Sequence, residues 1–309
     1  MQEVTNKFWA IGGGKGGVGK SIVSIMLGSA LAAQGKKVVL VDADLGGSNL
    51  HTLVGIRYPL YTLADFISRK VDNIEDVVMD TPVANLKLIC GADDILGIAN
   101  PKSTQKARLF NNLKRLDADY ILLDLGAGTS FTTIDFFLFA PNKIVVMTPQ
   151  ITSIQNSYGF IKASLYRGLS RAFRKETNCL ELIKKASSGE DSGGAGSITD
   201  LFSAFKSLDG DQAERLRNYI DNMSMRLIVN MVRDDKEKNV GNIVRNVAKN
   251  YLDLDIENLG LVRYDRVIEA SINKMDKFLS NRNNGNGVAS VCFYDIAGSI
   301  MKSSNRMTA

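Results

Sequence analysis

Short apolar runs alternate with amphipathic stretches along most of this chain. Seven runs are largely apolar and have the length of strands: 8–11, 37–41, 86–90, 120–123, 143–147, 226–229 and 259–262. Between them, apolar residues recur at helical spacing, for example in 21–34, 105–116, 243–252 and 293–301. This alternation predicts an α/β fold in which helices cover both faces of a mostly parallel, twisted sheet.

Three of the expected strands run directly into a polar residue. Asp42 follows the run 37–41, Asp124 follows 120–123, and Asn230 follows 226–229. Ligands of open α/β sheets bind outside the carboxyl ends of the strands. We therefore expect one ligand site that brings these three side chains to the same edge of the sheet.

A phosphate-loop motif lies between the first expected strand and the first expected helix. Its glycines allow backbone N–H groups to approach phosphate oxygens, and the following helix adds its positive N-terminal end. In this motif Lys20 reaches the β- and γ-phosphates and the Ser21 hydroxyl binds Mg²⁺. The alternative is a glycine-rich turn without a ligand. The residues are Gly14, Lys15, Gly16, Gly17, Val18, Gly19, Lys20 and Ser21.

Acidic residues at two strand ends suggest the rest of a magnesium-nucleotide site. Asp124 precedes Gly126 and Gly128, which is typical of a Walker B carboxylate followed by a loop that approaches the γ-phosphate. A helix-capping aspartate is the alternative. Asp42 and Asp44 lie two residues apart, so one can face the metal and the other can orient the attacking water.

Composition limits the class and the compartment. The 309 residues permit one large domain, and we expect a single domain over 1–309 with a helical insertion near 156–224. Cys90, Cys179 and Cys292 are far apart and form no C-x-x-C, which argues against zinc and iron–sulfur sites and suits a reducing cytosol. We find no signal-peptide pattern or membrane-length apolar run, and we expect a cytoplasmic protein.

The motifs together resemble one known family. Residues 15–21 resemble the deviant Walker A motif of the ParA/MinD family of P-loop ATPases, and 41–50 resemble its first switch. Residues 148–153 resemble its turn after the fifth strand, and 260–271 its late loop and helix beside the base. The resemblance is closest to the MinD/FlhG branch, whose members place division sites and flagella.

The resemblance implies a mechanism. Lys15 would cross a nucleotide-sandwiched homodimer to the partner's phosphates, and Asp44 would activate water. Asp42 and Asp124, with Ser21, would form the Mg²⁺ shell. The protein would bind ATP or ADP with Mg²⁺, hydrolyse ATP slowly, and wait for an activating partner protein. The implied catalytic residues are Lys15, Lys20 and Asp44, and the implied nucleotide contacts are residues 14–21, Ile22, Gly128, Asn230, which would read adenine, and Val262.

A basic stretch suggests a surface for an acidic partner. Residues 162–185 contain seven basic and two acidic residues, a net of +5. On a helix, Arg167, Arg171, Arg174 and Lys175 would lie opposite an apolar face. Such a helix can contact a membrane or DNA, or it can simply pack by its apolar face. Two functions therefore stay open: a MinD/FlhG-like switch, peripheral at the inner face of the cell membrane, or a ParA-like partition ATPase that binds DNA nonspecifically.

The last apolar stretch favours packing over membrane docking. Members of the MinD branch end in a basic amphipathic helix that targets the membrane. Here Phe293, Ile296 and Ile300 have helical spacing and a short polar segment follows them. We expect these residues to form the last core helix.

Overall fold

A single mixed sheet organises the molecule. The computed structural model describes residues 6–56, 58–91, 100–188, 197–273 and 287–308. Within these residues, eight strands form one sheet in the order β3-β4-β2-β5-β1-β6-β7-β8, and β3–β4 is its antiparallel pair. The strands are β1 Phe8–Gly12, β2 Val38–Asp42, β3 Val78–Asp80, β4 Leu86–Ile89, β5 Tyr120–Asp124, β6 Asn142–Met147, β7 Met225–Val232 and β8 Ile256–Arg263.

The seven predicted strands are all present, and the sequence analysis missed β3. This strand has only three residues, and it pairs with the edge strand β4 in the register Val78 to Ile89. Its side chains are exposed or half-buried, so its sequence lacks the apolar run that marks the other strands. The α/β, mostly parallel fold that the alternation predicted is confirmed.

Helices cover both faces of the sheet, and the alternation of side chains along β1 shows why. Phe8 and Ala10 belong to one buried cluster, whereas Trp9 and Ile11 belong to the other. Both sets of side chains leave water because neighbouring residues of a strand point to opposite faces. The helices on the first face are α4 Leu63–Ile67, α5 Ser103–Leu113, α6 Phe131–Phe139, α7 Ile151–Ala172 and α11 Val240–Leu252, and those on the second are α2 Lys20–Ala33, α3 Leu50–Leu53 and α13 Val288–Thr308.

The C-terminal helix packs as expected but is longer. Phe293, Ile296 and Ile300 are buried against α2 and β8, so this segment is a core helix. Helix α13 begins at Val288 and ends at Thr308, and it includes the polar segment that was expected to follow it. No helix among the described residues is both long and apolar enough to cross a bilayer.

The predicted basic helix over 162–185 is wrong as a single element. Helix α7 ends at Ala172 and a separate helix, α8, spans Thr177–Ser188. In the turn between them Phe173 is buried, and its ring meets Phe205 edge-on with centroids 5.1 Å apart. Arg215 lies over the Phe173 ring at 4.8 Å, so contacts distant in sequence stabilise a break that local periodicity does not reveal.

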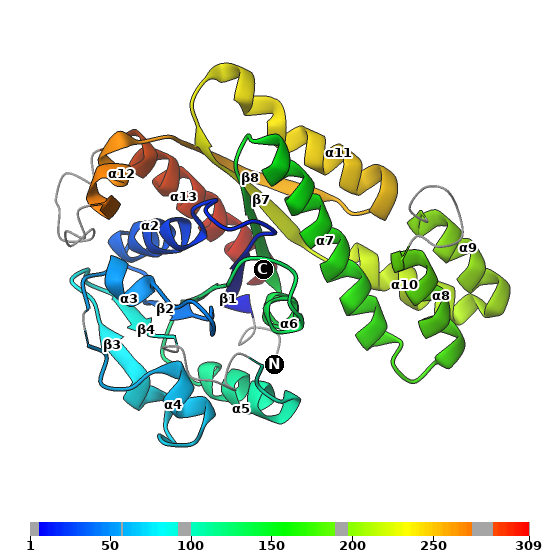
Figure 1. Ribbon diagram of the computed structural model, residues 1–309, viewed down its shortest axis with the longest axis horizontal. Helices are drawn as coiled ribbons and strands as arrows, with labels where there is room; N and C mark the ends of the chain where they lie inside the picture. The colour runs from blue at the N-terminus through cyan, green and yellow to red at the C-terminus, as the bar shows by residue number, and fades with distance from the viewer. Residues whose placement is uncertain (1–5, 57, 92–99, 189–196, 274–286, 309) are drawn as a thin grey trace.

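The expected start of the helical insertion, residue 156, lies inside a helix. Helix α7 starts at Ile151 and its first half covers the sheet, so 156 is not a structural boundary. Beyond its far end, α8, α9 (Ile198–Leu208) and α10 (Gly210–Asp221) form a projection away from the sheet (Figure 1). Ile161, Leu165 and Leu169 are fully buried, so the apolar face of the basic stretch packs inside the molecule.

Candidate nucleotide-binding site

The predicted site residues meet at the carboxyl edge of the central strands. Asp42 and Asp124 end neighbouring strands and are register partners, and Ile11 of β1 pairs with Asp124 on its other side. The loop after β1 leads into α2, and its Gly13 carbonyl accepts a hydrogen bond from the Gly128 amide at 3.3 Å. The phosphate loop and the loop after β5 are therefore held together by the backbone.

The glycines of the phosphate loop have two different tasks. Gly19 has φ +85°, and a Cβ there would lie 2.4 Å from Nδ2 of Asn230, so this position is closed by packing. Gly17 has φ +77°, and a Cβ there would meet nothing within 4 Å. A Cβ on Gly16 would have only Ala127 near it, at 3.9 Å. Gly16 and Gly17 are exposed and face open space, so a phosphate can approach the backbone there.

Lys20 is a buried cation at the start of α2. The residue is only 8% exposed. Burial lowers the pKa of Lys20, and the nearby carboxylates of Asp124 and Asp44 offset this in part. A further negative charge in the loop would stabilise the ammonium form, as expected of a lysine that meets phosphates.

Asp124 is a buried carboxylate whose charged form a nearby cation would stabilise. Burial raises its pKa to about 7, and the charge of Asp42 adds to the rise, while hydrogen bonds from Ser21 and Ser24 act against it. Ser24 Oγ donates to Oδ1 of Asp124 at 2.8 Å. The sequence analysis missed Ser24, although a serine one turn after Lys20 on a buried helix face was a usable signal.

The donor set fits magnesium. Among the described residues, no group of three or more histidine, cysteine, aspartate or glutamate side chains is placed to hold a metal ion. Mg²⁺ does not need such a group, because it binds through one or two carboxylates, water and substrate phosphates. Asp124 and the Ser21 hydroxyl next to it supply hard oxygen ligands of that kind.

Asp42 is largely engaged in the loop that follows β2. Its Oδ2 accepts from the Ser48 hydroxyl at 2.6 Å and from the amides of Asn49 and Leu50 at 3.1 and 3.0 Å. Burial raises the pKa of Asp42, and these hydrogen bonds favour its charged form. Asp42 therefore fixes the start of α3, and its expected place in the metal shell stays a prediction.

Asp44 faces the loop after β5. A Cβ on Gly126 would come within 2.8 Å of Oδ1 of Asp44, so a larger residue there would displace the carboxylate. The Asp44 side chain is half-buried, and its charge acts on Lys20. This places a second carboxylate beside the loop and Lys20, where it faces Gly126.

Lys15 is held at the outside of the loop. Its Nζ donates to Oγ1 of Thr152 at 2.8 Å and to Oε1 of Gln150 at 3.2 Å. Both acceptors lie at the start of α7, and the sequence analysis gave neither a role. The second lysine of the motif is thus tied to the molecular surface, whereas Lys20 is buried.

Three of the predicted nucleotide contacts line one small cavity. Ile22, Asn230 and Val262 border a space of about 190 Å³ beside the phosphate loop. Nδ2 of Asn230 donates to the Val18 carbonyl at 2.9 Å, so this amide also supports the loop. Met231, which follows Asn230, has φ +60°, a left-handed conformation that non-glycine residues seldom adopt outside special sites.

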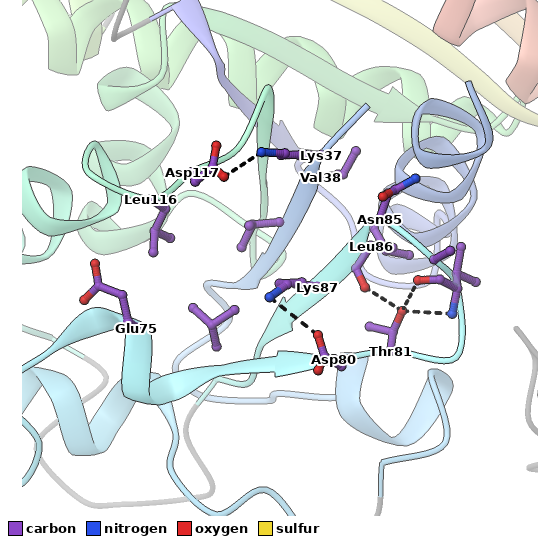
Figure 2. A pocket seen from close by; sticks show the side chains of 14 residues that line it. Lys37, Val38, Glu75, Asp80, Thr81, Asn85, Leu86, Lys87, Leu116 and Asp117 are labelled. Carbon is purple, nitrogen blue, oxygen red and sulfur yellow. Dashed lines mark hydrogen bonds and ion pairs between the residues drawn. The ribbon is translucent and has the colours of Figure 1, made fainter. Parts of the chain in front are cut away.

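A larger hollow lies at the opposite end of the strands from the predicted site. It has a volume of about 650 Å³ and borders the amino ends of β2 and β4 at Val38 and Leu86. Figure 2 shows the ion pairs at its rim, Lys37 with Asp117 and Lys87 with Asp80. None of the predicted site residues lines it, so size alone does not locate the ligand site.

Comparison with known families agrees with this geometry. The family model for the CobQ/CobB/MinD/ParA nucleotide binding domain matches residues 9–278. The chain belongs to this family. The predicted P-loop NTPase class is thereby confirmed, and the matched region includes the phosphate loop and both acidic strand ends.

Individual relatives point to the MinD side of the family. Antiactivator FleN of Pseudomonas aeruginosa is 34% identical over 155 residues, 50% of this chain and 54% of that protein. The septum site-determining protein MinD of Helicobacter pylori is 33% identical over 145 residues, 47% and 53%. The matches thus span about half the length of these relatives.

A solved structure agrees over nearly the whole chain. The septum site-determining protein MinD of Pyrococcus horikoshii, complexed with Mg-ADP, has a TM-score of 0.65 and 18% identity. It covers 96% of this chain and 97% of its own. At this level of identity the likeness establishes the fold.

Proposed function

We propose that this protein is a MinD/FleN-like switch ATPase that binds Mg·ATP, hydrolyses it slowly and dimerises in the ATP state. The relatives at or above 33% identity support this side of the family. The Mg-ADP in the Pyrococcus MinD supports the same ligand here. The nucleotide would occupy the cradle of residues 14–21 and the cavity beside Ile22, Asn230 and Val262, with Gly128 close to the γ-phosphate.

Each residue has a proposed task in the reaction. Lys20 binds the β- and γ-phosphates. Burial disfavours its ammonium form and two nearby carboxylates offset this only in part, so the negative phosphates stabilise it further. Ser21, Asp124 and Asp42 hold Mg²⁺, which when bound neutralises charge on the phosphate oxygens. Asp44 orients the attacking water, since it lies beside Lys20 and faces Gly126.

The observation that carries the switch proposal is the position of Lys15. The buried Lys20 already serves the phosphates inside the loop, whereas Lys15 is held at the surface by Gln150 and Thr152. In a dimer whose two loops face each other, Lys15 reaches the partner's phosphates. Its charge has most effect there, because the closed interface excludes water.

Light scattering tests this proposal. With ATP and in an Asp44→Ala background, the parent is expected to dimerise, and Lys15→Ala and Lys15→Gln are expected to stay monomeric while still binding nucleotide. Lys175→Ala is the matched control, because Lys175 is an exposed lysine far along the chain from the loop. ATP-dependent dimers of both Lys15 variants, formed as readily as those of the parent, would contradict the cross-subunit role.

The proposed cellular role is spatial. FleN and MinD suggest a switch for flagellar or division-site placement that acts through an activating partner, with peripheral membrane contact as a further proposal. Nothing specific favours the DNA-binding alternative. Arg167 and Arg171 of the basic stretch are both paired with Asp135.

A further inference from the structure

A groove on the side of the molecule is lined by more cationic than anionic side chains. It lies between α5, α6, α7 and α10 and has a volume of about 850 Å³. Four cations and one carboxylate line it, which leaves a net of +3. The charged residues are Lys106, Arg167, Arg171, Arg174 and Asp135.

One carboxylate is shared by three of these cations. Asp135 accepts from Lys106 at 2.8 Å, from Arg167 at 3.0 Å and from Arg171 at 3.4 Å. Lys106 and Arg167 are only 14% and 32% exposed in their side chains, so water compensates their repulsion poorly. Arg174 has no ion-pair partner among the residues that the structure describes. The groove is therefore short of anionic groups.

The floor of the groove is apolar. Phe110 and Phe139 stack with ring centroids 3.4 Å apart, and Leu138 lies beside them. Tyr219 of α10 closes one side. A Cβ on Gly168 of α7 would lie 1.9 Å from its hydroxyl oxygen, so glycine allows α10 to come this close. The groove thus offers an apolar surface next to unpaired positive charge.

This shape favours a peptide over a large polyanion. Duplex DNA and bilayers meet proteins along broad surfaces, whereas Lys106 and Arg167 are set below the surface beside aromatic rings. A protein segment can place one carboxylate inside the groove and an apolar side chain on its floor. We propose that this groove binds an acidic segment of a partner protein that carries aspartate or glutamate next to an aromatic or aliphatic residue.

The proposal goes beyond the ATPase function and does not depend on it. The groove is built from helices α5, α6, α7 and α10, and none of the predicted nucleotide-site residues lines it. A failure of nucleotide binding would leave the groove and its charge unchanged. The two proposals can therefore fail separately.

Selection from a displayed library of random twelve-residue peptides tests the groove. Panning against the full chain should enrich peptides with aspartate or glutamate beside an apolar residue. A synthetic copy of the best peptide should then lose about tenfold or more in affinity for Arg174→Glu, because the reversed charge repels it. Lys175→Glu is the matched control, since it makes the same charge change on an exposed neighbour that does not line the groove.

The outcomes separate the possible ligands. A loss confined to Arg174→Glu, with glutamine-substituted peptide no longer bound, supports the proposal. Equal losses for Arg174→Glu and Lys175→Glu would show a mere effect of net charge and overturn it. Absence of acidic enrichment would also overturn it. If Arg174→Glu instead weakened retention on a labelled DNA duplex or on anionic phospholipid vesicles, the ligand would be a phosphate polyanion. Circular dichroism should show every variant folded, because Arg174 is exposed.

Discussion

The carboxyl edge of the sheet buries charged side chains, whereas the helical projection buries apolar side chains and exposes its charges. At the edge, Lys20, Asp42 and Asp124 are buried. Burial lowers the pKa of Lys20 and raises those of Asp42 and Asp124, so it favours the neutral form of each. In the projection, α8, α9 and α10 bury apolar faces and leave charged residues such as Glu181 and Lys184 outside. The edge gives up favourable solvation that a ligand restores, while the projection gains stability from packing and from ion pairs such as that of Arg215 with Glu176.

This difference decides where a substitution acts. Removing a charged group from the edge takes away a group that folding has already desolvated, so the chain should stay folded and lose ligand. Removing a paired group where the projection joins the body should change stability and leave nucleotide binding intact. The following predictions test that separation.

Lys20→Ala should cause the largest loss of nucleotide affinity. Without the buried ammonium, binding of Mg·ADP and Mg·ATP should fall by about a hundredfold or more, because a charge-assisted contact to phosphate disappears. Unfolding in urea should change little, since burial already disfavours the charged lysine. Calorimetric titration measures the affinity, and Lys175→Ala is the control. Parent-like affinity in Lys20→Ala would place the nucleotide elsewhere.

Asp44→Ala should separate binding from hydrolysis. A positioned acid–base group contributes about 10²- to 10⁴-fold to a rate, so single-turnover hydrolysis should fall by that factor. ATP affinity should stay close to that of the parent, because water is oriented only on the way to the transition state. Asp80→Ala, at an exposed aspartate paired with Lys87, serves as the control. Hydrolysis at the parent rate would remove Asp44 from the mechanism.

The same contrast explains what the sequence could predict. Strands and core helices follow from local periodicity, and the phosphate loop from a fixed spacing of glycine, lysine and serine. The break at Phe173 depends on Phe205, and the surface position of Lys15 depends on Thr152. Contacts of this kind join residues 32 and 137 positions apart, so no local pattern contains them.

Asp135→Asn should lower stability where α7 leaves the sheet. Burial alone would raise the pKa of Asp135, but hydrogen bonds from Arg167 and Lys106 outweigh it and hold the pKa below its usual range. The free energy of unfolding should fall by about 2 kcal/mol at pH 7, because three cations lose one shared carboxylate. Urea unfolding measures it, with Asp80→Asn as the exposed control.

The pH dependence of this effect has a fixed sign. The folded-state pKa of Asp135 lies below the unfolded value of about 3.9. Its contribution is therefore complete above that value and is lost as the pH falls through the folded pKa. The difference between parent and Asp135→Asn should shrink in acid below about pH 4. A difference that is constant from pH 7 to pH 2.5 would show that the carboxylate charge is not its source.

Thr152→Val should produce the smallest effect, and it should strengthen a property, ATP-dependent dimerisation, where the other variants weaken one. Thr152 accepts a hydrogen bond from Lys15 in the single chain, and this bond must break if Lys15 crosses to a partner. A neutral acceptor of this kind contributes about 0.5–1 kcal/mol, and each dimer breaks two such bonds, one in each protomer. ATP-dependent dimerisation in the Asp44→Ala background should therefore tighten by about five- to thirtyfold. Ser203→Ala, at an exposed hydroxyl on α9, should leave the dimer unchanged. Sedimentation equilibrium measures the constant. A weaker dimer in Thr152→Val would mean that Thr152 acts in the assembled state, so that α7 supports Lys15 across the interface and does not hold it back.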